Sequence, residues 1–134
     1  MLIKLVFLGS KSYSMAHIPY PYKRLQSRRY VFISIGKKRI EKVVDFVPLK
    51  TPNLMNLGFG DLLPDGSIDD KANSNNGDIL KVLATVVNIL KHFTTRHPEI
   101  VIFFAGSTHD RTKLYARILK TYYTVFSQEL IFTE

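Results

Sequence analysis

The segment that most restricts the fold is an uninterrupted apolar run, IVIFFA at residues 100–105, with helical periodicity on both sides. A strand that is apolar at every position is typical of a sheet whose two faces are both covered. The small polar residues Gly106, Ser107 and Thr108 follow where such a strand leads into a helix, which is a common ligand position. The run therefore predicts a central strand buried on both faces, and a candidate site, but no reaction.

The flanking helices are predicted over residues 78–96 and 109–126, where apolar residues recur at three- and four-residue steps. Pro98 ends the first helix. Either Asn75 or Asn76 is expected to cap its N-terminus. His92 and His97 lie near its basic end, so we interpret them as helix-end residues rather than ligands.

Three earlier segments have the composition of strands. Residues 30–35 and 40–47 predict a hairpin, and residues 53–63 predict a third strand. Gly58 and Gly60 fall on one face of that third strand, which indicates a bulge or a close backbone approach. A last strand is predicted over residues 129–133. The expected fold class is α+β, in which antiparallel strands precede a β-α-β-α-β unit and two main helices pack on a mixed sheet.

Composition restricts the function more weakly than the fold. The 134 residues suffice for one domain, expected at residues 30–134, with residues 1–29 as an N-terminal extension or edge strand. No cysteine is present, which excludes disulfides, thiolate zinc sites and a cysteine nucleophile. No segment is long and apolar enough to span a bilayer. Lys4 interrupts the short apolar start, so a signal peptide is disfavoured and a cytoplasmic location is expected.

The net charge of +8 suits an anionic partner such as nucleic acid, a nucleotide phosphate or an acidic protein, although a merely basic protein has the same charge. The oligomeric state is left open. The exposed basic residues are expected at the hairpin tip and along the second helix: Lys37, Lys38, Arg39, Lys113, Arg117 and Lys120.

A ligand cleft is predicted where the third strand and the apolar strand end beside the two helix N-termini. The polar residues at this edge that packing does not explain are Asn56, Asp61, Asp69, Asp70, Asn76, Ser107, Thr108 and Arg111, with Tyr115 added from the second helix. Asp61 and Arg111 are expected to form an ion pair across it. Residues 68–78 are rich in oxygen-bearing side chains, but their spacing does not match a calcium loop, so no metal is predicted.

The order of elements from the second strand onward resembles the acetyltransferase (GNAT) superfamily, as does R-x-x-L-Y at residues 111–115. That resemblance implies an acyl-CoA loop of the form Gln/Arg-x-x-Gly-x-Gly/Ala before the first helix. This chain has NSNNGD at residues 73–78, with one glycine and an acidic residue near the would-be phosphates. No cofactor is therefore predicted.

A second resemblance is to a family of small uncharacterised bacterial proteins, mostly from Bacteroidetes, over residues 30–132. The shared patterns are YxFxSxG (30–36), IxKV (40–43), NLGFGD (56–61), DD (69–70), NNGD (75–78), VLATV (82–86) and GSTxxRxxLY (106–115). This resemblance implies no activity.

Two functions stay open. The first is a non-enzymatic binding or regulatory domain with an anionic partner, although no known nucleic-acid motif is present. The second is a divergent acyltransferase-like enzyme that uses the cleft beside Ser107, Thr108 and Tyr115. No nucleophile and base are visibly paired, because His109 is only a sequence neighbour of Ser107 and Asp110.

Overall fold

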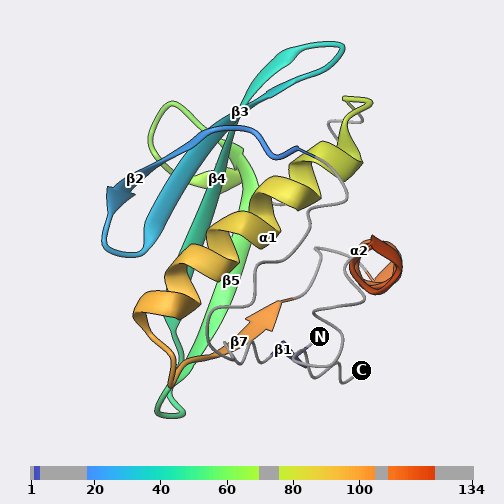
Figure 1. The fold of residues 1–134 in the computed structure, drawn as a ribbon. Coiled ribbons are helices and arrows are strands. Elements are labelled where there is room, and N and C mark those ends of the chain that lie inside the picture. The colour runs from blue at the N-terminus through green and yellow to red at the C-terminus, as the bar shows by residue number, and fades with distance from the viewer. Residues whose placement is uncertain (1, 4–17, 70–75, 105–108, 123–134) are drawn as a thin grey trace.

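The structure is a computed structural model that describes residues 2–3, 18–69, 76–104 and 109–122 (Figure 1). Its elements are β1 (Leu2–Ile3), β2 (Tyr22–Gln26), β3 (Arg29–Ile35), β4 (Arg39–Pro48), β5 (Leu54–Leu62), β6 (Ile68–Asp69), α1 (Ile79–Arg96), β7 (Val101–Phe104) and α2 (His109–Tyr122). The predicted helices and the predicted hairpin are present.

The strands form one mixed sheet in the order β1-β7-β5-β4-β3-β2, with β6 paired to β5. The pair β5–β7 is parallel and is connected through α1, as the sequence predicted, whereas the other pairs are antiparallel. The fold class is therefore the expected α+β arrangement.

The helix α1 lies across one face of the sheet (Figure 1). Strand positions that alternate toward it, including Tyr30 and Phe46, are fully buried. The rings of Phe46 and Phe93 stack with centroids 3.9 Å apart, which joins the sheet to α1. The ring of Tyr115 on α2 stacks on Phe104 of β7 at 5.7 Å, and Phe104 pairs with the core residue Leu57 of β5. Both helices thus pack on this one face, which we call the helix face.

The opposite face is partly covered by the β5–β6 hairpin. Arg29 forms a bidentate ion pair with Asp45, at 2.7 Å for each bond, and also donates to the Gly66 carbonyl at 2.7 Å. A Cβ added at Gly60 would lie 2.5 Å from the backbone oxygen of Asp69. The close approach predicted from the paired glycines is therefore confirmed, with Gly60 at the closest point.

The prediction that β7 is buried on both faces is wrong. The strand has a neighbour on each side, β1 and β5, and Ile102 and Phe104 are buried. Phe103, however, is 37% exposed. The physical reason is that both helices pack on the helix face, while Phe103 alternates toward the other face, which no described helix covers.

The remaining segments complete the sheet. Residues 68–69, at the start of the segment rich in oxygen-bearing side chains, pair with β5. Strands β1 and β2 lie before residue 30 and are the two outermost strands of the sheet. The strand expected at residues 129–133 lies outside the described residues. No helix in the described part of the chain is long and apolar enough to cross a membrane.

Candidate functional site

The predicted cleft edge contains a buried ion pair that the sequence did not suggest. Lys42 of β4 lies directly opposite Asp61 of β5, and its ammonium group bonds to the Asp61 carboxylate. Lys42 is only 5% exposed, and its ammonium lies 5.8 Å from the ring centroid of Phe59. A signal was present in the sequence, because Lys42 alternates with Val44 and Phe46 and so had to lie on the core face.

The predicted ion pair between Asp61 and Arg111 is not the one that forms. Asp61 pairs with Lys42 instead. The antiparallel register of β4 and β5 places those two residues opposite each other, whereas Arg111 belongs to a helix that follows β7. A strand neighbour is thus a nearer partner than a residue reached through the crossover.

The structure does not bring all the predicted cleft residues together. Asn56 has the strand parity of Gly58 and Gly60, so it lies on the face opposite Asp61. Asp69 is half-buried on β6, and Asp70, Ser107 and Thr108 lie outside the described residues. Tyr115 is a packing residue, because its ring stacks on Phe104. Burial raises the pKa of Tyr115, and the nearby charge of Arg111 opposes that rise.

Asn76 has a role that differs from the expected helix cap. The residue is 5% exposed, and its side-chain oxygen accepts from the Lys38 backbone N–H at 2.7 Å. Its amide nitrogen donates to the Lys38 carbonyl at 2.8 Å and to the Ser34 hydroxyl at 2.9 Å, and its own carbonyl accepts from the Lys37 N–H at 3.0 Å. Asn76 therefore closes the β3–β4 hairpin and does not cap α1, while Asn75, the other expected cap, lies outside the described residues.

The side chain of Asp78, the residue at the N-cap of α1, also bonds outward rather than to its helix. Its carboxylate accepts hydrogen bonds from the hydroxyls of Tyr20 and Ser34, each at 2.6 Å. Burial raises the pKa of the Tyr20 hydroxyl, and its bond to Asp78 raises it further. We call the residues Tyr20, Ser34, Asn76 and Asp78 the hairpin lock, because together they join α1 to the β3–β4 turn.

The hairpin lock requires a glycine at position 36. A Cβ added there would lie 1.8 Å from the Asn76 backbone oxygen. The patterns YxFxSxG and NNGD therefore meet in space, since Ser34 and Gly36 of the first contact Asn76 of the second. The lock explains these residues structurally, and it holds a tip whose side chains Lys37, Lys38 and Arg39 are all exposed.

A groove of about 530 Å³ lies beside this hairpin, along β2 and β3. Its lining is mostly apolar and includes Leu25, which is 54% exposed, and Ile35, which is 60% exposed. Its charged lining residues are Lys23, Arg39 and Glu41. The groove was not predicted, because its walls come from strands whose pairing and edge position only the fold reveals.

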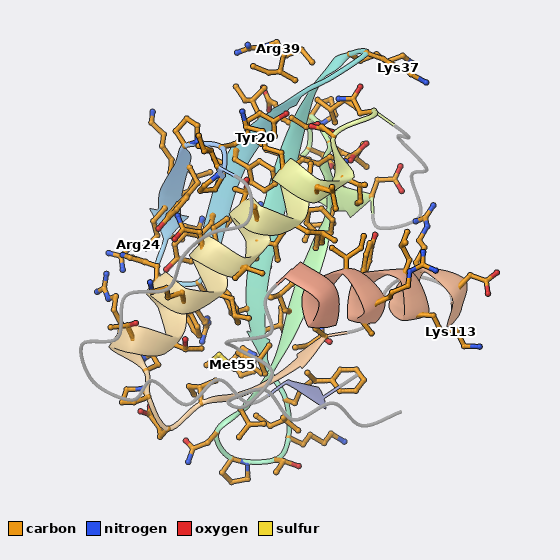
Figure 2. The ribbon with its side chains drawn as sticks, turned by 45° about the vertical axis from the view of Figure 1, so that its right-hand side comes forward. Tyr20, Arg24, Lys37, Arg39, Met55 and Lys113 are labelled. Carbon is orange, nitrogen blue, oxygen red and sulfur yellow. The ribbon has the colours of Figure 1, made fainter. Side chains whose placement is uncertain are left out.

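The basic residues expected at the hairpin tip and on the second helix form two separate groups. Lys113 and Arg117 are exposed on α2, and the side chain of Lys120 lies outside the described residues. Figure 2 shows Lys37 and Arg39 at the hairpin tip and Lys113 on α2, well apart from them. Within the described part of the chain, no group of three acidic or histidine side chains could hold a metal ion.

Comparison with known proteins identifies a family but no activity. The model of a family of unknown function (DUF6934) matches residues 16–133. Neither the curated proteins nor the solved structures contain a match to this chain. The resemblance to the acetyltransferase superfamily is therefore not confirmed.

Proposed function

Because the chain belongs to this family of unknown function, its role has to be inferred from its surface, and we propose that it is a non-enzymatic, cytoplasmic binding domain for an acidic protein segment. The segment occupies the groove along β2 and β3, and its acidic side chains meet the hairpin tip. The single observation that carries this proposal is the exposed apolar groove with basic residues at its border.

The apolar lining supports a protein partner. An exposed apolar surface bordered by polar residues commonly marks a site of protein interaction. Leu25 and Ile35 expose more than half of their surface, which a bound segment would remove from water. Nucleic acid would use the basic residues but would have little use for the apolar lining.

The charges favour an acidic partner. Lys23 and Arg39 line the groove, and Lys37 and Lys38 extend the positive charge beyond it. Glu41 is the one acidic residue of that lining. A positive surface also accelerates the encounter with an acidic partner, and this effect declines as salt is added.

The hairpin lock supports binding by holding the tip in one conformation. Asn76 bonds the backbone of Lys37 and Lys38 directly, so the side chains project from an ordered turn. A preorganised surface loses less conformational entropy on binding than a mobile one.

Binding of a fluorescently labelled peptide of alternating glutamate and leucine tests the proposal. Replacing Lys37, Lys38 and Arg39 by alanine should weaken binding and reduce its salt dependence, because the attraction between these cations and the glutamates of the peptide is removed. Leu25→Ser with Ile35→Ser should weaken binding without changing that dependence. The matched control is Lys113→Ala with Arg117→Ala on α2, which should bind normally.

Equal binding of a glutamate–serine peptide would contradict the proposal, because the apolar lining would then contribute nothing. An equal loss in the α2 control would also contradict it, since net charge alone would then explain the binding. RNA that binds more tightly than the peptide at high salt would replace the acidic segment as the partner.

A further inference from the structure

A cationic cluster lies at the far end of α1 from the hairpin lock, and we propose that it binds a phosphate monoester. The cluster consists of Arg24 on β2, the Tyr30 hydroxyl on β3, and His92 and Arg96 on α1. None of these four residues lines the groove, and Figure 2 shows Arg24 well apart from Lys37 and Arg39.

The fold brings these four residues together from three elements. Arg24 is the register partner of Tyr30 in the β2–β3 pair, so both side chains lie on the helix face. His92 lies over them, with its Nδ1 at 3.1 Å from the Tyr30 hydroxyl oxygen. Arg96 follows His92 by one helical turn and lies on the same side of α1. The Tyr22 ring, 6.1 Å from that of His92, borders the cluster.

Within the described part of the chain, the two arginines of the cluster have no ion-pair partner. Among the described residues, the ion pairs are Arg29–Asp45 and Lys42–Asp61, and neither Arg24 nor Arg96 takes part in one. Burial lowers the pKa of His92, and the charges of Arg96 and Arg24 lower it further. Burial raises the pKa of Tyr30, and the same two arginines oppose that rise. The positive charges of both arginines therefore act on His92 and on Tyr30.

Fold stability alone does not explain this arrangement. A positive residue at the C-terminal end of a helix is favourable, which accounts for Arg96. It does not account for Arg24, which comes from a strand and adds a second positive charge that, like Arg96, acts on His92. Like charges that converge on one point repel each other, and an anion between them would relieve that repulsion.

The chemistry of the cluster matches a terminal phosphate group. Guanidinium groups bind phosphate oxygens through paired N–H donors, and two of them match a dianion in charge. If Nδ1 of His92 accepts from the Tyr30 hydroxyl, the ring proton is on Nε2, which then donates to the phosphate. A diester, with a single negative charge and two blocked oxygens, would be bound less well.

Binding is coupled to the protonation of His92. In the free protein the pKa of His92 lies below its ordinary value of 6.5, because of burial and then of Arg96 and Arg24. The groups that face the His92 ring are Tyr22 and Arg24 from β2, Tyr30 from β3, and Arg96 from α1. A bound dianion favours the protonated ring, so binding of phenyl phosphate should raise the pKa of His92.

Calorimetric titration of the whole chain with phenyl phosphate tests the site, together with a nuclear magnetic resonance titration of the His92 ring. Saturable binding is expected, with a rise in the pKa of His92 on saturation. Arg24→Gln and Arg96→Gln should each weaken binding by about tenfold, the loss expected for one charged hydrogen-bond partner. All these residues are exposed, so the variants should fold.

The matched control is Lys23→Gln, because Lys23 is next to Arg24 but alternates toward the opposite face. This variant should bind phenyl phosphate as the parent does, and so should the variant with alanine at residues 37–39. An absence of saturable binding would overturn the proposal, and so would an equal loss in Lys23→Gln. Dimethyl phosphate bound as tightly as phenyl phosphate would also overturn it and would indicate a nucleic-acid backbone instead.

Discussion

The two ends of α1 use polar side chains in opposite ways. At its N-terminal end, Tyr20, Ser34, Asn76 and Asp78 form the hairpin lock, in which donors and acceptors meet within hydrogen-bonding distance. At its C-terminal end, Arg24, His92 and Arg96 converge with Tyr30 without a carboxylate among the described residues.

The difference separates structural polar groups from groups suited to a ligand. A buried polar cluster contributes to a unique fold when all its members are bonded within the protein. The charges in a cluster of like sign are not neutralised within the protein, so they can bind an anion. The types of polar residue therefore do not distinguish the two ends of α1. The two ends differ in the partners that the fold places beside those residues.

The largest expected effect is that of Gly36→Ala, which disrupts the hairpin lock. The new Cβ would lie 1.8 Å from the Asn76 backbone oxygen, so the hairpin and the segment before α1 must separate. We expect a loss of more than about 3 kcal/mol in the free energy of unfolding. Chemical denaturation measures this loss.

The matched control for this substitution is Gly58→Ala. A Cβ at Gly58 would lie 3.7 Å from the Ile68 side chain, which is an ordinary contact distance. This variant should unfold nearly as the parent does. Equal losses at the two glycines would show that the hairpin lock does not depend on the close approach at Gly36.

The next effect concerns Lys42→Met, which leaves the Asp61 carboxylate without its strand partner. Breaking a buried pair from one side costs about 3 kcal/mol, and the partial exposure of Asp61 should reduce that figure. Adding Asp61→Leu should recover much of the loss, and denaturation of all three variants tests this. A double mutant as unstable as the sum of the single ones would show that the two residues are not coupled.

A smaller loss is expected for Asn76→Ala. It removes the side-chain bonds to Lys38 and Ser34 and leaves buried groups unpaired, which costs about 2 kcal/mol. When Ser34→Ala is combined with Asn76→Ala, it should lower the free energy of unfolding by less than it does alone, because the two residues bond to each other. Hydrogen exchange should show the loss of protection at the Lys38 N–H, and unchanged exchange there would contradict this role of Asn76.

The smallest effect, and the sharpest test of the contrast, is that of Arg96→Gln on His92. Removing one of the two nearby charges should raise the pKa of His92 toward 6.5, as measured by nuclear magnetic resonance. Because the folded pKa is lowered, the unfolded chain takes up the proton first as the pH falls. The stability that neutral His92 contributes is therefore present above pH 6.5 and is lost as the pH falls from 6.5 through the folded pKa.

Unfolding midpoints on either side of pH 6.5 should thus differ less in Arg96→Gln than in the parent chain. Lys23→Gln is the control, since Lys23 does not appear among the charges that act on His92. If Arg96→Gln left the pKa of His92 unchanged, as Lys23→Gln should, Arg96 would not act electrostatically on His92.

Much of the fold followed from local patterns. The spacing of apolar residues predicted α1 and α2, and the strand-like composition of residues 30–35 and 40–47 predicted the hairpin. Gly58 and Gly60 indicated the close approach of the β5–β6 hairpin. These features depend on residues that are near in sequence, where periodicity and turn chemistry act directly.

The candidate site was less predictable. The sequence did not indicate the partner or neighbour of four residues, namely Lys42, Asp61, Asn76 and Arg24. In each case that residue is more than five positions away, so its proximity depends on strand register or on helix docking. Phe103 shows the same limit, because its exposure depends on which face the helices cover.

The sequence by itself determined the kinds of elements, their order, the parallel crossover around α1 and the excess of positive charge. Only the tertiary structure decided which polar groups neutralise one another. Asn76 and Asp78 are satisfied because the hairpin reaches them, while Arg24 and Arg96 both act on His92 because β2 packs at the sheet edge beside the end of α1. The reason is physical: periodicity depends on local backbone geometry, whereas charge compensation depends on distances that only long-range packing sets.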